Sequence, residues 1–214
     1  IMVWGKEALS WFTNNGVSKN KIKITGNPRF DRLASLIPPK KSRRHPQILL
    51  LPNPIDRKIT RTLIKSFASA TATFSGKKII KLHPSESDEK WFRLQIPNRF
   101  KNEIQVISKS LPDMDIGVGD IVVVGNSSAG IDAILLGAAV VNVNLQGMPN
   151  PIPYMKYKVG ITCCLENLNK SILLVMQTNQ NEWIKNRTGF LRNFLYNTDG
   201  QSAKRAAELI TRGF

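Results

Sequence analysis

Three side chains with useful chemistry follow two apolar runs of the sequence. His83 comes directly after the run 77–82, in IIKLHPSE, and Ser127 and Ser128 follow the run 121–124, in IVVVGNSSAG. An imidazole at such a point can donate a hydrogen bond to a departing phosphate or place positive charge beside it. Hydroxyls and backbone amides at the start of a helix suit phosphate oxygens. The pattern therefore predicts an anion-binding site in which His83 is the catalytic residue.

The neighbours of these side chains complete the predicted site. Pro84 holds the turn and keeps His83 extended, and Glu86 is within reach of a helix N-terminus or a ligand hydroxyl. Asp132 lies one turn into the second helix, where a carboxylate can accept both hydroxyls of a ribose or simply complement the helix dipole. We expect the phosphate or ribose of a nucleotide to contact the whole small-residue turn: Gly125, Asn126, Ser127, Ser128, Ala129 and Gly130.

Each of these patterns also has a structural explanation. A His-Pro turn can end a strand without any chemical role, and one serine can cap the helix while the other packs. The small-residue turn is not a Walker loop, because no Gly-Lys-Ser/Thr follows, and the G-x-G-x-x-G spacing of dinucleotide-binding proteins is absent. It does not match the G-x-S-x-G motif of serine hydrolases either. A functional site requires that these turns share one pocket.

The elements that position the turns alternate along the chain. Short β-branched or apolar runs predict strands at 2–4, 21–25, 47–51, 77–82, 104–107, 121–124, 139–143 and 159–163. Helical spacing predicts helices at 7–14, 57–73, 89–95, 168–177, 183–195 and 201–211, and one more between Gly130 and a stop at Gly137. Strands that alternate with helices predict an α/β fold, a Rossmann-like doubly wound parallel sheet.

Domain organisation follows from one stretch without apolar periodicity. Residues 38–46 contain Pro-Pro, His-Pro and several basic residues, which are typical of a linker. We therefore expect 1–37 to end an N-terminal Rossmann-like domain and 47–214 to form a C-terminal nucleotide-binding domain with a helical tail. Just before the linker, Gly26 and Asn27 allow an unusual backbone turn, and Asp31 is placed to cap the turn that follows, at 33–36. The chain opens on Ile1, so we expect a piece of a longer protein.

Composition limits the partners. Lys+Arg is 31 against 15 for Asp+Glu, a net charge of +16 that favours anionic partners. No nucleic acid is expected, because basic and aromatic residues do not interleave as in RNA-binding sheets. No apolar run reaches the roughly 18 residues of a membrane span. The adjacent Cys163 and Cys164 lack the spacing of a zinc site, so no metal is expected, and a reducing cytoplasmic location fits them. The charge also suits peripheral contact with the anionic inner face of a membrane.

Three motifs together resemble a known group of enzymes. ITGNPRFDRL, KLHPSE and VGNSSAGIDAILLG, in that order, resemble nucleotide-sugar enzymes of the GT-B architecture, in which two Rossmann-like domains face each other across a cleft. The greatest similarity is to bacterial capsule and surface-polysaccharide transferases: the Kdo transferases, polysialyltransferases and teichoic-acid glycerophosphotransferases. Their His-Pro and Ser-Ser motifs hold the phosphates of the donor nucleotide, which implies that role for His83-Pro84 and Ser127-Ser128. The resemblance also implies that Gly26, Asn27, Arg29 and Asp31 lie near the interdomain cleft.

The resemblance implies a reaction and two alternatives. A glycosyltransferase would move a sugar from a CMP-, CDP- or UDP-linked donor to a polysaccharide or glycolipid acceptor, with the donor as substrate and no other cofactor. UDP-N-acetylglucosamine 2-epimerases are similar too. Asp132 stands where these enzymes usually have Glu before Ala, and the segment NLQGMPNPIP lacks the Glu-Arg-Pro-Glu type of sequence associated with the epimerases. A third possibility is a non-catalytic basic module that binds anionic lipid or nucleic acid.

Overall fold

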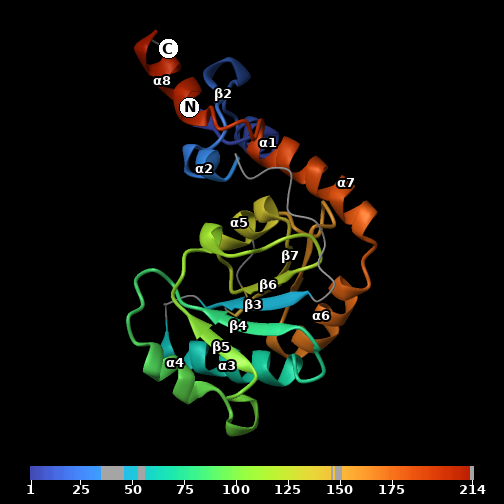
Figure 1. Cartoon of the computed structure of the whole chain (residues 1–214). Helices are drawn as coiled ribbons and strands as arrows, with labels where there is room; N and C mark the ends of the chain where they lie inside the picture. Colours follow the sequence, from blue (N-terminus) through green and yellow to red (C-terminus); the bar gives the residue numbers. More distant parts are fainter. Residues whose placement is uncertain (35–45, 53–55, 146, 148–150, 213–214) are drawn as a thin grey trace. The chain divides into compact units, whose positions relative to one another are not determined.

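The computed structural model describes residues 1–34, 46–52, 56–145, 147 and 151–212 of the chain (Figure 1). It divides into two compact units. Unit 1 combines Ile1–Pro38 with Ile184–Phe214, and unit 2 is Pro39–Trp183. The predicted linker, 38–46, lies outside the described residues except for Pro46.

Unit 2 is built on a six-stranded sheet in which all neighbouring strands are parallel. Its strands are β3 (Gln47–Leu51), β4 (Lys77–Lys81), β5 (Ile104–Ile107), β6 (Ile121–Val124), β7 (Ala139–Val143) and β8 (Gly160–Cys163). Every residue of the two central strands, β3 and β6, is buried, as their unbroken apolar runs require. The predicted doubly wound parallel sheet is confirmed.

The strand order is β5-β4-β3-β6-β7-β8, so the direction of winding reverses between β3 and β6. In open α/β sheets, ligands bind in the crevice outside the carboxyl ends of the strands at such a reversal. The chain leaves β6 through the turn that begins at Gly125, and leaves β4, on the other side of β3, through the turn that contains His83. Both predicted anion-binding turns therefore lie at the edge of the sheet where ligands are expected.

Helices cover both faces of this sheet (Figure 1). Helices α3 (Arg57–Ala70), α4 (Glu89–Gln95) and α6 (Leu168–Met176) pack on one face and share the main apolar core with the strands. Helix α5 (Ala129–Leu136) packs on the opposite face, against β6 and β7. Local signals set the helix ends: Asp56 caps α3 by accepting the N–H of Lys58 at 2.6 Å, and Gly137 ends α5 in the left-handed conformation, at φ 112°.

A buried carboxylate ties the two central strands together where they begin. Asp120, which is fully buried, accepts the backbone N–H of Gln47 at 2.9 Å and the side-chain amide of Gln47 at 3.1 Å. It also accepts the N–H of Gly117 at 3.0 Å. Since a buried charge is tolerated only with such partners, Asp120 fixes the start of β6 against the start of β3, and hence the register of the strand that leads to the turn at Gly125.

Unit 1 is formed by the two ends of the described chain. Strands β1 (Met2–Val3) and β2 (Lys23–Ile24) form a parallel pair. The helices are α1 (Lys6–Asn14), α2 (Asp31–Ala34), α7 (Gln180–Phe190, in this unit from Ile184 on), a π-helical turn Leu191–Leu195, and α8 (Ser202–Thr211). The sequence predicts residues 184–214 as part of the C-terminal domain, whereas the structure places residues 184–212 in one unit with residues 1–34.

Aromatic contacts explain that difference. Trp4 packs edge-on against Phe194, with ring centroids 6.2 Å apart. A Cβ added at Gly5 would lie 2.5 Å from the carbonyl oxygens of Asn193 and Phe194, so only glycine allows this close approach. These partners are nearly the whole chain apart, and no local pattern in the sequence reports such a contact.

The eight predicted strands and seven predicted helices are all present, with ends shifted by up to three residues when the π-helical turn Leu191–Leu195 is counted with α7. Helix α7 starts earlier than predicted because Asn179 Oδ1 accepts the N–H groups of Asn181 and Glu182, at 2.9 and 3.2 Å. In the part of the chain that the structure describes, five short 3-10 helices occupy Lys19–Lys21, Pro28–Phe30, Asn98–Phe100, Leu111–Asp113 and Leu165–Asn167. Among the described residues, no helix has both the length and the apolar composition needed to cross a bilayer.

Candidate functional site

The turn after β6 enters α5 through hydrogen bonds made by Ser127. Ser127 Oγ accepts the N–H of Ala129 at 3.2 Å, and the Ser127 carbonyl accepts the N–H of Gly130 at 3.2 Å. Ser128 occupies the N-cap position, but its side chain makes no capping hydrogen bond. Ser127 therefore orders the first turn of α5. The start of a helix carries partial positive charge, which attracts anions.

His83 is exposed at the end of β4, and its ring is oriented by Ser85. His83 Nδ1 accepts the backbone N–H of Ser85 at 3.2 Å and lies 2.7 Å from Ser85 Oγ. Because Nδ1 acts as an acceptor, the neutral imidazole carries its proton on Nε2. The turn is closed by a hydrogen bond of 2.9 Å from the N–H of Glu86 to the carbonyl of His83. The arrangement leaves Nε2–H to donate to a ligand, as the predicted role of His83 requires.

Glu86 makes a structural contact. Its carboxylate pairs with the guanidinium of Arg57 at 3.0 Å, and Arg57 also lies over the ring of Trp91, 4.3 Å from the centroid. Arg57 is the first residue of α3. Glu86 therefore pairs with a side chain in the first turn of α3, and the predicted contacts with a helix N-terminus or a ligand hydroxyl stay predictions. Pro84, between His83 and Glu86, is exposed.

A buried lysine was missed by the sequence analysis. Lys81, two residues before His83, is only 6% exposed, and its Nζ donates to the carbonyl of Leu82 at 2.8 Å. Burial lowers the pKa of Lys81, and the negative charge of Asp132 opposes that shift. The two charges therefore interact across the end of β3, from the end of β4 to the first turn of α5. A lysine inside the apolar run KKIIK is the signal that could have indicated this residue.

Two further residues that the sequence analysis missed contact the turn before α5. Asn142 of β7 is fully buried and hydrogen-bonds with Asn126. Tyr154 is also fully buried, and its hydroxyl donates to the carbonyl of Ser127 at 3.5 Å. Burial and the charge of Asp132 both raise the pKa of Tyr154. An asparagine within the apolar strand AVVNV was a readable signal, whereas nothing in the sequence around Tyr154 distinguishes it.

The two turns end strands that both pair with β3. Since adjacent strands lie about 4.8 Å apart, the ends of β4 and β6 are about 10 Å apart on the same edge of the sheet. One nucleotide-sugar molecule can bridge that distance. Within unit 2, the topology therefore brings His83 and the Ser127-Ser128 turn to the same edge of the sheet, on either side of the end of β3.

The GNPRFD motif lies in unit 1, where Gly26 and Asp31 contact the start of α8. Gly26 has φ +81°, and a Cβ there would lie 2.4 Å from Ser202 Oγ. Next to it, the carbonyl of Thr25 accepts Arg205 Nε–H at 2.8 Å. Asn27 Oδ1 accepts the N–H of Arg29 at 3.0 Å, which starts the short helix that follows.

Asp31 caps a different helix from the one predicted. Its carboxylate accepts the N–H of Ser202 at 3.0 Å and the N–H of Ala203 at 2.8 Å, at the start of α8. The observed cap is thus on α8, because a carboxylate stabilises whichever helix N-terminus the fold brings to it. The predicted cap on the turn at 33–36 extends beyond the described residues and stays a prediction. The position of Gly26, Asn27, Arg29 and Asp31 relative to an interdomain cleft stays a prediction.

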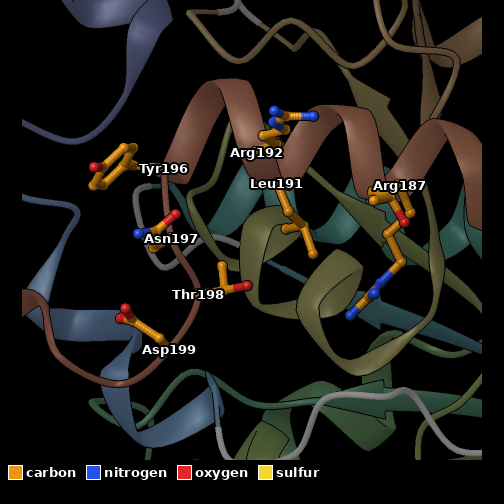
Figure 2. Close-up of a pocket in the computed structure, with 8 residues that line it drawn as sticks. Arg187, Leu191, Arg192, Tyr196, Asn197, Thr198 and Asp199 are labelled. Carbon is orange, nitrogen blue, oxygen red and sulfur yellow. The ribbon is translucent and has the colours of Figure 1, made fainter.

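Unit 1 also contains a pocket of about 490 Å³ (Figure 2). Its lining residues, none of which the sequence analysis named, are Arg187, Thr188, Leu191, Arg192, Tyr196, Asn197, Thr198 and Asp199. Burial lowers the pKa of Arg187 to about 10, so that it stays charged at neutral pH. A two-pronged hydrogen bond from Arg205, at 2.8 and 3.0 Å, holds the pKa of Asp199 below its usual range. Figure 2 shows Arg187 and Arg192 extending to different sides of their helix.

The remaining titratable groups are dispersed. Within the described ranges, no three His, Cys, Asp or Glu side chains gather as a metal site would require. Cys163 and Cys164 are both free thiols, Cys163 partly buried and Cys164 exposed. Burial raises the pKa of Cys163.

Comparison with known sequences finds no match: no family model fits the chain, and no curated protein is similar to it. Comparison with solved structures does find matches. The UDP-GlcNAc 2-epimerase from Neisseria meningitidis bound to UDP-GlcNAc is 14% identical, with a TM-score of 0.63 over 98% of this chain and 60% of that one. The epimerase from Methanocaldococcus jannaschii is 16% identical, with a TM-score of 0.61 over 96% of this chain and 60% of that one.

A glycosyltransferase from Rickettsia africae is also similar. It is 14% identical, with a TM-score of 0.58 over 100% of this chain and 64% of that chain. At these identities the likeness establishes the fold, and the chain spans about 60% of the length of the epimerases. The described chain thus has the Rossmann-like fold of the GT-B nucleotide-sugar enzymes.

Proposed function

We propose that this chain is the donor-binding part of a glycosyltransferase, which moves a sugar from a CMP-, CDP- or UDP-linked donor to a surface polysaccharide or glycolipid. The observation that carries the proposal is the placement of two turns at the switch point of the sheet. One presents His83 with its proton on Nε2, and the other presents the start of α5 with Ser127 and Ser128. The net charge of +16 supports an anionic ligand.

The proposed reaction is direct displacement at the anomeric carbon of the donor sugar. The acceptor hydroxyl oxygen forms the new bond, its proton passes to a base, and the bond from the sugar to the nucleotide phosphate breaks. Negative charge then develops on the departing phosphate. His83 Nε2–H and the N-terminus of α5 stabilise that charge, and the loss of one such donor typically lowers kcat by about 10²–10³.

A nucleotide-binding screen tests this proposal. Thermal shift and calorimetry with CMP, CDP, UMP, UDP and GDP should identify at least one nucleotide that stabilises the protein. His83→Ala and Ser127→Ala should each weaken its binding by about tenfold, the effect of one lost charge-assisted hydrogen bond. Ser87→Ala is the matched control, since Ser87 is exposed in the same segment as His83 and should leave binding unchanged. Stabilisation by none of the five nucleotides would refute the proposal.

A UDP-N-acetylglucosamine 2-epimerase is the second candidate, because enzymes of that name are among the similar solved structures. Product analysis separates the two. The protein is incubated with UDP-N-acetylglucosamine and no acceptor, and the sugars are identified by chromatography and mass spectrometry. Free N-acetylmannosamine or its UDP derivative would establish the epimerase and exclude the transferase.

We also propose that the protein works in the cytoplasm and touches the anionic inner face of the membrane, where a glycolipid acceptor would lie. Sedimentation with phosphatidylserine vesicles should show binding that falls steeply with added salt. A non-catalytic basic module predicts the same salt dependence without any response to mononucleotides, so the nucleotide screen separates it from a transferase.

A further inference from the structure

Two asparagine side chains form a closed pair beneath the turn that precedes α5. Asn142 Nδ2 donates to Asn126 Oδ1 at 2.9 Å, and Asn142 Oδ1 accepts the backbone N–H of Asn126 at 2.9 Å. Asn126 Nδ2 also points to Asn144 Oδ1, at 3.4 Å. Asn142 lies on β7 in register with Val124, the last residue of β6. The pair therefore links β7 directly to the turn that leaves β6.

The pair is unusual because Asn142 is fully buried within an otherwise apolar strand. A buried amide without partners costs several kcal/mol, so its polar atoms must be satisfied. In this structure both atoms are satisfied by one residue, Asn126. The amide thus stabilises one particular conformation of Asn126 rather than the sheet in general.

That conformation is left-handed. Asn126 has φ +48°, which is uncommon for a residue other than glycine and which asparagine tolerates better than most. Its backbone N–H and its side chain are both used in the pair. Immediately after it, Ser127 makes the hydrogen bonds that begin α5. The direction in which the start of α5 faces therefore depends on the conformation that Asn142 imposes.

The turn is also supported on its helix side. The ring of Tyr154 occupies the space where a Cβ of Gly130 would lie, and its hydroxyl donates to the carbonyl of Ser127. Ser127 thus lies between two stabilising contacts: the Asn142–Asn126 pair from β7 on one side and the hydroxyl of Tyr154 on the other. A turn held on both sides binds a ligand with less loss of conformational entropy than a mobile one.

We propose that Asn142 is a positioning residue for phosphate binding: through Asn126 it holds the turn so that the N-terminus of α5 faces the phosphate of a nucleotide. The inference rests on the proposed function of this turn and adds to it a residue that lies on another strand and does not itself touch the ligand. It predicts that the loss of the amide pair loosens the turn and weakens nucleotide binding together.

Two variants and two measurements test the proposal. Asn142→Leu keeps a buried side chain of similar size and removes the pair. Ile104→Val, on the distant strand β5, is the control for a general loss of stability, because it trims another buried side chain. Hydrogen exchange of the Gly130 and Ile131 amides reports on the turn without any ligand, and calorimetry with the nucleotide found in the screen reports on binding.

We expect Asn142→Leu to exchange these amides at least tenfold faster and to bind the nucleotide at least tenfold more weakly, while Ile104→Val stays within twofold of the wild type in both. Unchanged exchange would overturn the inference whether or not a nucleotide binds. Faster exchange with unchanged affinity would overturn it too, by reducing Asn142 to a purely structural role. If the wild type binds no nucleotide, the proposed function is wrong. Faster amide exchange in Asn142→Leu would then show only that Asn142 stabilises the turn, and the proposed role in phosphate binding would be overturned.

Asn142→Asp provides a second test if the leucine variant does not fold. A carboxylate still accepts the N–H of Asn126 but cannot donate to Asn126 Oδ1 until it is protonated. The affinity of this variant relative to the wild type should therefore recover as the pH falls from 8 to 5. A ratio that does not change with pH would contradict the proposed hydrogen bond.

Discussion

Replacing Gly130 by alanine tests how tightly Tyr154 holds the turn before α5. A Cβ at Gly130 would lie 2.1 Å from Tyr154 Oη and 2.9 Å from Tyr154 Cζ. Both distances are much shorter than the optimum of about 3.5–4.0 Å between non-bonded carbon atoms. Because Tyr154 is fully buried, its ring has to move against packed neighbours to make room.

The size of the effect follows from opposing contributions. Overpacking of this kind costs about 1–3 kcal/mol. The hydrogen bond from Tyr154 to the carbonyl of Ser127 is long, at 3.5 Å, so its loss adds little. Alanine favours a helix over glycine by up to about 1 kcal/mol, which offsets part of the cost. We therefore expect the free energy of unfolding to fall by about 1–2 kcal/mol, and the melting temperature by about 2–4 °C for each kcal/mol.

Urea and thermal unfolding, followed by circular dichroism, measure this loss. Gly189→Ala is the matched control, because Gly189 also lies in a helix and a Cβ there would meet nothing within 4 Å. It should stabilise the protein by about 0.4–1 kcal/mol. Tyr154→Phe removes the atom nearest to the new Cβ, so the double variant with Gly130→Ala should lose less stability than the sum of the two single variants.

Two results would refute the reasoning. If Gly130→Ala stabilises the protein as Gly189→Ala does, Tyr154 does not occupy the space beside the turn. If the losses from Gly130→Ala and Tyr154→Phe simply add, the two residues are not in contact.

Two further predictions follow from the buried titratable groups. Because burial holds the pKa of Lys81 below the usual 10.5, the unfolded chain binds that proton more tightly. Lys81 therefore destabilises the fold at neutral pH, and this destabilisation fades as the pH rises from the folded pKa towards 10.5. The free energy of unfolding of the wild type, measured relative to that of Lys81→Met, should therefore rise between pH 8 and pH 10. Parallel curves of unfolding free energy against pH for the two proteins would contradict this. Iodoacetamide at pH 8 should label the exposed Cys164 well before Cys163, because burial raises the pKa of Cys163. Peptide mass spectrometry measures the two labelling rates, and equal rates would contradict the assigned environments.

Much of the fold could be predicted from the sequence because the relevant signals are local. The unbroken apolar runs of β3 and β6 identify central strands, and Asp56 and Gly137 mark helix ends through their own backbone preferences. Strands that alternate with helices lead to a parallel sheet, because each helix carries the chain back to the edge where the previous strand began. The same rule places the turns at His83 and Ser127 on one edge of the sheet, as the structure confirms.

The partners of the polar side chains could not be predicted in this way. Asp31 was expected to cap the turn beside it, yet it caps α8, 171 residues further along the chain. Glu86 was given two candidate roles, and the ion pair with Arg57 became visible only in the structure. A carboxylate or an amide binds whichever donor the fold brings near, and its type alone does not identify that donor.

The sequence by itself thus determined the α/β alternation, the parallel sheet and the edge at which the two turns proposed to bind the nucleotide lie. Only the tertiary structure decided that residues 184–212 pack in one unit with 1–34, and that Asn142 and Tyr154 support the Ser127 turn. The physical reason is the range of the interactions. Periodicity and capping act within a few residues, whereas a buried amide pair or a glycine that admits a tyrosine ring depends on elements that meet only when the chain is folded.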